Sequence, residues 1–150
     1  LENLAESGDN SQVLAQGMVL AGASGAGVIM PGMSETVSVS LVDTKPMLLS
    51  AATMLVNTND AFSGINAMSL ENMAVGESIS LRTSSYDSGT EKNSETMATI
   101  PGPAAGGEGF NAERDDVGVI TSDDGLMQSV LIQAHRFDNP TLAISVTRVE

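Results

Sequence analysis

Short runs in which polar and apolar residues alternate recur along this sequence, separated by stretches rich in glycine and other turn-forming residues. Residues 36–42 place Val37, Val39 and Leu41 on one face, and residues 77–83 alternate in the same way. An alternation of period two is typical of a half-buried β-strand. The sequence therefore predicts a mostly β fold.

Three further segments are predicted as strands. Residues 48–56 are almost continuously apolar, which favours a central strand that is buried on both sides. Residues 127–134 and 142–149 are predicted as two more strands, joined through the turn Asp138-Asn139-Pro140. Short strands at regular intervals with Gly-rich turns indicate an all-β fold, an antiparallel β-sandwich.

Two segments near the start of the sequence differ from this pattern. Residues 1–8 carry apolar residues at helical spacing and end in Gly8, so they predict a short N-terminal helix. Residues 17–32 are rich in glycine around a short apolar run, which favours a strand edge followed by a flexible loop. With 150 residues and no internal linker or repeat, the sequence predicts a single domain, 1–150.

Charge and composition exclude several classes of partner and chemistry. The formal net charge is −13, with only six Lys and Arg residues, so the sequence argues against binding to nucleic acid or to an anionic bilayer. There is no cysteine, which excludes disulfides, thiolate metal sites and a Cys nucleophile. No apolar run is long enough to predict a membrane-spanning helix.

Acidic residues stand in two loops that follow predicted strands. Residues 53–64 lead from an apolar strand into a loop with Asp60, and the stretch Tyr86-Asp87-Ser88-Gly89-Thr90-Glu91 adds two carboxylates. Asp60, Asp87 and Glu91 converge if the two loops meet at one end of a sheet, and hard oxygen ligands of this kind favour Ca²⁺. The alternative is that these acidic residues are solvated turn residues.

Other acidic residues have the composition of turns rather than of ligand sets. Asp115, Asp116, Asp123 and Asp124 flank a short apolar strand, and Asp123-Asp124-Gly125 is typical of a hairpin turn. The residue spacing of an EF-hand loop is absent.

The sequence predicts no enzyme. His135 is the only histidine, and no Ser or Cys partner for it is recognisable, so it is interpreted as a structural or surface residue. Paired carboxylates for glycoside hydrolysis are compatible with the spacing. However, one Tyr, three Phe and no Trp leave few aromatic platforms for a sugar cleft.

Four blocks of sequence carry a resemblance to the spondin amino-terminal domain family, the module of F-spondin, mindin and bacterial secreted proteins. The most specific features are Thr-Asn-Asp within the second block and the Tyr-Asp-small-Gly-Thr-acid loop of the third. The blocks are LENLAESGDNSQVLA, LLSAATMLVNTNDAFSGIN, SSYDSGTEKNSE followed by IPGPAAGGEG, and HRFDNPTLAISVTRVE.

The resemblance implies a β-sandwich like that of calcium-dependent phospholipid-binding modules, with Ca²⁺ bound near Asp60, Asp87 and Glu91. It also implies a secreted or cell-surface protein with an adhesive or matrix role, which binds an extracellular protein or glycan. The sequence departs from the family at Ala61, where Trp is frequent, at Asn66, where an acidic residue is frequent, and at Ala105, where bacterial relatives often have Cys.

A second function class is a structural subunit. The family's first strand precedes its helix, whereas this sequence begins at the helix, so we expect a sheet edge that lacks its usual neighbour. A strand from another copy can complete such an edge and propagate into an extracellular filament or matrix. Size-exclusion chromatography or electron microscopy separates a monomeric binding module from this polymer.

Overall fold

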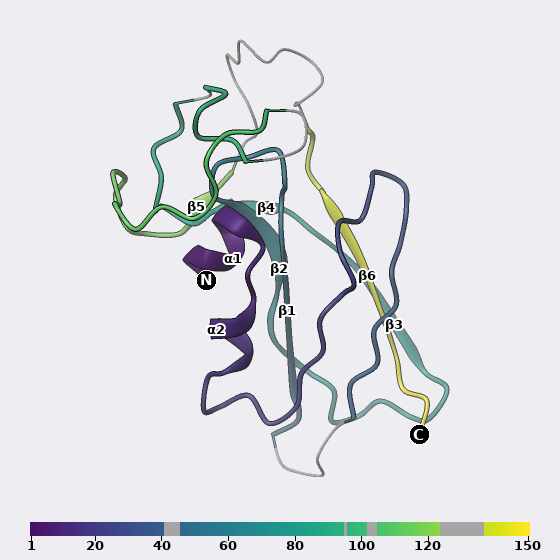
Figure 1. The fold of residues 1–150 in the computed structure, drawn as a ribbon. Coiled ribbons are helices and arrows are strands. Elements are labelled where there is room, and N and C mark those ends of the chain that lie inside the picture. Colours follow the sequence, from purple (N-terminus) through teal and green to yellow (C-terminus); the bar gives the residue numbers. More distant parts are fainter. Residues whose placement is uncertain (41–45, 95, 102–104, 124–136) are drawn as a thin grey trace.

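The protein folds into two antiparallel β-sheets with two short helices at the N-terminus (Figure 1). The computed structural model describes residues 1–40, 46–94, 96–101, 105–123 and 137–150. The larger sheet has four strands and the smaller sheet has two. None of the helices in these ranges has the length and the apolar character that crossing a bilayer requires. The predicted mostly β fold is confirmed at this level.

The helices are α1 (Glu2–Ser7) and α2 (Ser11–Leu14). The four-stranded sheet has the order β1 (Leu48–Met54), β2 (Ala61–Ser69), β4 (Ser85–Asp87) and β5 (Thr121–Ser122). The two-stranded sheet pairs β3 (Ser78–Thr83) with β6 (Leu142–Thr147). The chain therefore leaves the small sheet at Thr83 and enters the large sheet at Ser85.

Helix α1 agrees with the predicted N-terminal helix. It buries Leu4 and Ala5 and contacts β1 and β2. Gly8 ends the helix with a φ of 77°, and its backbone N–H donates to the carbonyl oxygen of Leu4 over 3.0 Å. Only glycine adopts this left-handed conformation without steric cost. The short helix α2 was not predicted, because the sequence after Gly8 favours a turn.

Strands β1 and β2 form an antiparallel hairpin, with Leu48 opposite Ser69 and Met54 opposite Phe62. Strand β2 was not predicted, because residues 53–64 were interpreted as an apolar strand that leads into a loop with Asp60. A Cβ atom on Gly64 would lie 2.1 Å from the carbonyl oxygen of Ala51. Gly64 is thus the residue that allows the two backbones to approach closely.

The strand predicted over residues 48–56 is present as β1, Leu48–Met54, but it is not buried on both sides and is not central among the described strands. Strand β1 lies at the edge of the larger sheet and pairs only with β2 among the described strands. Leu48 is 51% exposed, and Ser50, Ala51 and Ala52 are also exposed. An apolar run predicts that a strand packs against other parts of the protein. How many strands pair with it depends on long-range contacts, which the local sequence does not show.

The β3–β6 ribbon confirms two predicted strands. The register places Ile79 opposite Val146 and Leu81 opposite Ile144. These apolar residues are half-buried, whereas the alternating polar residues are exposed. The hydroxyl oxygens of the facing pair Ser78 and Thr147 lie 2.7 Å apart. The alternation of period two therefore gives the ribbon one apolar and one polar face.

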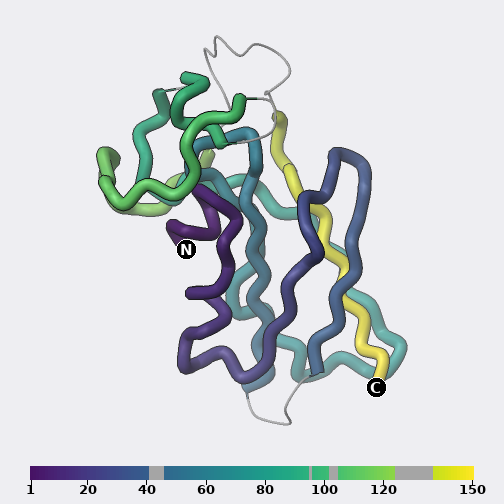
Figure 2. The backbone as a smooth tube through the Cα atoms, viewed as in Figure 1, coloured from purple at the N-terminus to yellow at the C-terminus, as the bar shows by residue number. Residues whose placement is uncertain are grey.

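Residues 17–40 contain no described strand or regular helix. Figure 2 shows that this segment makes two long passes, with a reversal between them, before the chain enters β1. Within this segment, the backbone N–H of Met33 donates to the carbonyl oxygen of Met30 over 2.9 Å in a turn. Both the strand edge predicted within 17–32 and the described part of the strand predicted over 36–42 are therefore absent, because neither finds a ladder partner among the described residues. The strand predicted over 127–134 lies outside the described residues.

Many of the buried side chains in the described part of the chain are polar. The buried apolar residues are Leu4, Ala5, Ala61, Leu70, Met73 and Ile100. Beside them lie the buried polar residues Glu6, Thr58, Asn59, Asp60, Ser63, Thr83, Ser85, Asp87, Ser88, Thr90 and Glu91. Most of this second group belongs to the ends of β2 and β4 and to the loops next to them. The interior near α1 is therefore a hydrogen-bonded polar network.

Candidate functional site

The loop between β1 and β2 and the loop after β4 meet at one end of the four-stranded sheet. Asp60 directly precedes β2 and Asp87 ends β4, and the register pairs Ala61 with Asp87. Glu91 follows in the second loop. Their exposed fractions are 0%, 5% and 4%, respectively. The fold thus brings the three predicted residues into one buried network.

Asp60 is the acceptor at the centre of this network. Its Oδ2 accepts hydrogen bonds from the backbone N–H of Thr90 over 2.9 Å and of Glu91 over 3.0 Å. The hydroxyl of Ser88 donates to the same oxygen over 2.9 Å, and Oδ1 accepts from the side-chain amide of Asn59 over 3.2 Å. Charge-assisted hydrogen bonds of this kind are stronger than neutral ones. Asp60 therefore holds the loop after β4 against the start of β2.

Asp87 shapes the turn that follows β4. Its Oδ1 accepts from the backbone N–H of Gly89 over 2.6 Å, and its Oδ2 accepts from the side-chain amide of Asn93 over 2.6 Å. Burial, and then the negative charge of Asp60, raise the pKa of Asp87 despite these hydrogen bonds. Gly89 has a φ of 73°, and a Cβ atom there would lie 2.3 Å from the carbonyl oxygen of Val119. The turn therefore requires glycine.

Glu91 is the buried carboxylate with an unsatisfied oxygen. Its Oε1 is buried and has no hydrogen-bond partner among the described residues. Burial raises the pKa of Glu91 to about 8, and the negative charges of Glu6, Glu108, Asp60 and Asp115 add to this effect. Its backbone is well held, because the carbonyl oxygen accepts from the Asn59 side-chain amide over 2.9 Å. The side chain is thus positioned in a negative, poorly solvated environment.

Glu6 is a fourth member of the network, which the sequence interpretation missed. It lies on α1 and is 1% exposed. Its Oε2 accepts from the backbone N–H of Asn111 over 2.9 Å, and burial raises its pKa. An acidic residue in a short N-terminal helix is normally solvated. The one sequence signal for burial is that Glu6 directly follows the apolar residues Leu4 and Ala5, which are buried as well. We call Glu6, Asp60, Asp87 and Glu91 the acidic cluster.

The hydroxyl of Thr90 connects two members of the acidic cluster. Thr90 Oγ1 lies 2.7 Å from Glu6 Oε1 and 3.1 Å from Asp60 Oδ2. A hydroxyl has a single proton and donates to one acceptor at a time. Thr90 therefore shares its hydroxyl proton between Glu6 and Asp60. The hydrogen bond from Thr90 lowers the pKa of Glu6, but burial raises it by more.

Within the part of the chain that the structure describes, no ion pair joins a cation to the acidic cluster. The ion pair that the described residues contain joins the guanidinium of Arg114 to the carboxylate of Glu2, outside the cluster. That pair lowers the pKa of Glu2 and raises the pKa of Arg114. Burying a carboxylate without a positive partner costs free energy. Protonation of the carboxylate or binding of an external cation lowers this cost.

The side chains of the acidic cluster do not form a preassembled metal cage. Among the described residues, no group of three or more His, Cys, Asp or Glu side chains is arranged so that it could hold a metal ion. The donor set is nevertheless chemically suited to a hard cation, because it consists of carboxylate and hydroxyl oxygens. Shared ligation of one ion by Asp60, Asp87 and Glu91 stays a prediction.

The remaining acidic residues that the sequence assigned to turns are peripheral. Asp115 is exposed, and its Oδ1 accepts from the backbone N–H of Lys92 over 2.7 Å. Asp116 accepts from the backbone N–H of Val117 over 2.7 Å. Asp123 lies next to β5. Asp124 and His135 lie outside the described residues, so their predicted roles stay predictions.

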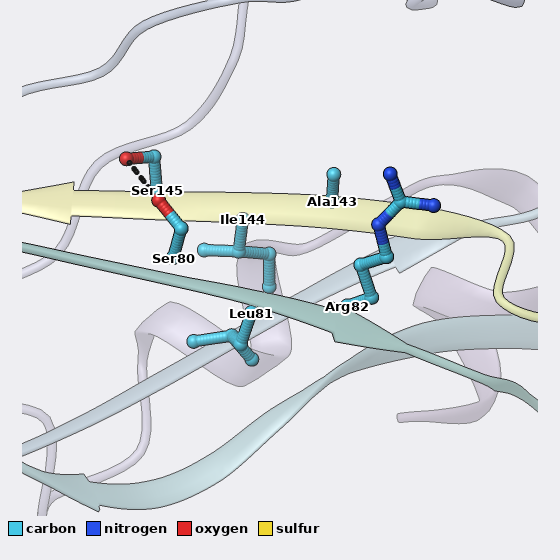
Figure 3. A pocket seen from close by; sticks show the side chains of 6 residues that line it. All are labelled: Ser80, Leu81, Arg82, Ala143, Ile144 and Ser145. Atoms are coloured by element: carbon cyan, nitrogen blue, oxygen red, sulfur yellow. Dashed lines mark hydrogen bonds between the residues drawn. The ribbon is translucent and has the colours of Figure 1, made fainter.

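A shallow cavity of about 430 Å³ lies on the β3–β6 ribbon (Figure 3). Its lining residues are Ser80, Leu81, Arg82, Ala143, Ile144 and Ser145. The hydroxyl oxygens of Ser80 and Ser145 lie 3.2 Å apart. This lining contains no carboxylate, imidazole or thiol, so the two serine hydroxyls have no general base beside them in the lining.

Comparisons of the chain with protein-family models, with curated proteins and with solved structures find no match. The resemblance to the spondin amino-terminal domain therefore rests on the four sequence blocks alone, and the function derived from it is a proposal.

Proposed function

We propose that this protein is a calcium-binding β module in which the acidic cluster holds the ion. The observation that carries the proposal is Glu91 Oε1, a buried carboxylate oxygen without a described hydrogen-bond donor. Leaving such an acceptor unsatisfied costs on the order of 1–3 kcal/mol, and more if the group is charged. A divalent cation removes this cost and also offsets the mutual repulsion of Glu6, Asp60 and Glu91.

The ligands that we assign to the ion are Asp60, Asp87 and Glu91, as predicted, together with Glu6. A carboxylate has about four lone-pair positions, so most of these oxygens keep acceptor capacity beyond their present hydrogen bonds. Glu91 Oε1 is a buried oxygen of the cluster that has no hydrogen-bond partner among the described residues. Backbone carbonyls and water complete the shell of 6–8 oxygens that Ca²⁺ takes in general.

A calcium titration followed by thermal melting tests this proposal. We expect the melting temperature to rise with calcium and to return when a chelator is added, because a ligand that binds only the folded state stabilises it. Glu91→Gln is expected to abolish most of the rise. Glu113→Gln is the matched control, because Glu113 is exposed and lies outside the cluster. A wild-type melting temperature that ignores both calcium and chelator overturns the proposal.

We further propose that the module acts outside the cell, as a spondin-like adhesion or matrix protein that binds a surface protein or a glycan. Its support is the resemblance of the four blocks, together with the burial of Asp60, Asp87 and Glu91 at the loops where the resemblance puts them. We infer that the two sheets belong to a β-sandwich like that of calcium-dependent phospholipid-binding modules. Binding of the purified protein to immobilised extracellular glycans and matrix proteins, with and without calcium, tests this role; no binding to any of them contradicts it.

A further inference from the structure

The segment 36–40 has the sequence of a strand but does not belong to a sheet. Its residues are Thr36-Val37-Ser38-Val39-Ser40, which alternate polar and apolar. Val37 is 48% exposed, and the backbone of the segment makes no hydrogen bond to other backbone groups in the described part of the chain. A strand-forming segment whose N–H and C=O groups have no backbone partner among the described residues is able to add to a sheet edge.

Strand β1 presents such an edge. One side of it pairs with β2, and no described strand pairs with the other side. Natural edge strands are usually protected by charged residues, proline, β-bulges or a covering segment. The sequence of β1, LLSAATM, contains no charged residue and no proline, and Leu48 is 51% exposed. Apart from an irregularity in register between Leu49 and Ala51, the described residues of this edge are therefore uncharged and largely exposed.

The charges of the two segments permit contact between copies of this chain. The net charge of −13 makes most surfaces of two copies repel each other. Neither residues 36–40 nor β1 contains a charged residue. Uncharged segments of high β propensity without proline are those that pair most readily between chains. A second copy is thus a partner whose donor segment matches the acceptor edge in both pattern and charge.

We propose that two copies associate by strand addition, with residues 36–40 of one copy pairing with the free edge of β1 in the other. The donor and the acceptor are different surfaces, so the contact closes into a dimer when it is reciprocal and extends into a chain when it is not. This association requires no calcium and is independent of the acidic cluster. A structural subunit of a filament would use this same contact between copies.

Light scattering coupled to size-exclusion chromatography, from micromolar to millimolar protein, tests the association. We expect a concentration-dependent dimer or larger species in the wild type and its loss in Val39→Pro, because proline removes a ladder N–H. Val28→Pro is the matched control, since Val28 is 63% exposed in the same irregular region but outside the donor segment. A wild type that stays monomeric at all concentrations overturns the proposal, as does a Val39→Pro variant that associates like the wild type.

Cysteine cross-linking identifies the contact independently of the proline variants. The chain has no cysteine, so Val37→Cys and Ala51→Cys each introduce a single thiol. We expect a mixture of the two variants under oxidising conditions to give more disulfide-linked dimer than either variant gives alone. A mixture that gives no such excess, with both variants folded by circular dichroism, shows that residues 36–40 do not reach the β1 edge of another copy and overturns the proposal.

Discussion

The backbone N–H of Glu91 donates to Oδ2 of Asp60 over 3.0 Å, so one buried carboxylate fixes the segment that carries another. This contact stabilises the charge of Asp60 through a hydrogen bond. At the same time it keeps the side chain of Glu91 near that charge, which contributes to the raised pKa of Glu91. The hydrogen bond to Asp60 thus orders the loop after β4, while the carboxylate of Glu91 in the same loop has an unsatisfied oxygen.

Asp60→Ala is expected to lower the free energy of unfolding by about 2–4 kcal/mol, because it leaves the buried N–H groups of Thr90 and Glu91 without acceptors. Urea denaturation measures this loss. Asp115→Ala is the matched control, because this exposed residue also accepts one backbone hydrogen bond, and we expect a loss of about 0.5–1 kcal/mol. Equal losses in the two variants would contradict the central role of Asp60.

Stability in a chelator is expected to fall as the pH rises from about 5 to about 8. The pKa of Glu91 is raised from 4.5 to about 8, so the folded state keeps a proton that the unfolded chain releases over this range. The contribution of Glu91 is therefore complete below its unfolded pKa and is lost as the pH approaches 8. One such proton gives a slope of up to about 1.4 kcal/mol per pH unit.

Denaturation curves at several pH values, with Glu91→Gln beside the wild type, measure this slope. Glu91→Gln is expected to reduce it, whereas Glu113→Gln, a change at an exposed residue, is expected to leave it unchanged. Glu6 and Asp87 have raised pKa values as well, so some slope of the same sign remains in Glu91→Gln. A slope that is identical in all three proteins would show that Glu91 titrates normally.

Gly89→Ala is expected to destabilise the protein more than Gly76→Ala does. Both glycines have positive φ values, 73° and 84°, and alanine in this region costs about 1–2 kcal/mol. At Gly89 the new Cβ would also lie 2.3 Å from the carbonyl oxygen of Val119, whereas at Gly76 nothing lies within 4 Å. We expect an additional loss of about 1–3 kcal/mol at Gly89 from overpacking. Thermal melting of the two variants gives the comparison, and equal melting temperatures would contradict it.

Ser63→Ala is expected to weaken the connection between the two sheets. Ser63 on β2 is fully buried; its hydroxyl donates to the carbonyl oxygen of Ser84 over 2.8 Å and lies 2.7 Å from Thr83 Oγ1. Removing it leaves buried polar groups unsatisfied, at a cost of about 1–3 kcal/mol. Ser80→Ala, which removes an exposed hydroxyl on β3, is expected to change stability by less than about 0.5 kcal/mol. Chemical denaturation distinguishes the two, and a neutral Ser63→Ala would refute the prediction.

Sequence reasoning placed Asp60, Asp87 and Glu91 in two loops that meet, and the structure gathers them at one end of the larger sheet. It did not find Glu6, because the burial of a helical carboxylate depends on which loops pack over the helix. The unsatisfied Oε1 of Glu91 was equally out of reach, since a missing hydrogen-bond partner is defined by the whole surrounding structure. Metal binding stays a prediction: among the described residues, no group of three or more His, Cys, Asp or Glu side chains is arranged to hold an ion.

The sequence by itself determined the local features of this protein: the end of the first helix at Gly8, the two-faced strands β3 and β6, and a donor set limited to oxygen by the absence of cysteine. These follow from backbone sterics, from side-chain period and from composition, which act over a few residues. Only the tertiary structure decided that β1 is an edge strand, that β2 continues through Gly64, and that four carboxylates are buried together. Those outcomes depend on which distant segments pair, and it is this pairing that sets the burial and the electrostatic neighbours of each residue.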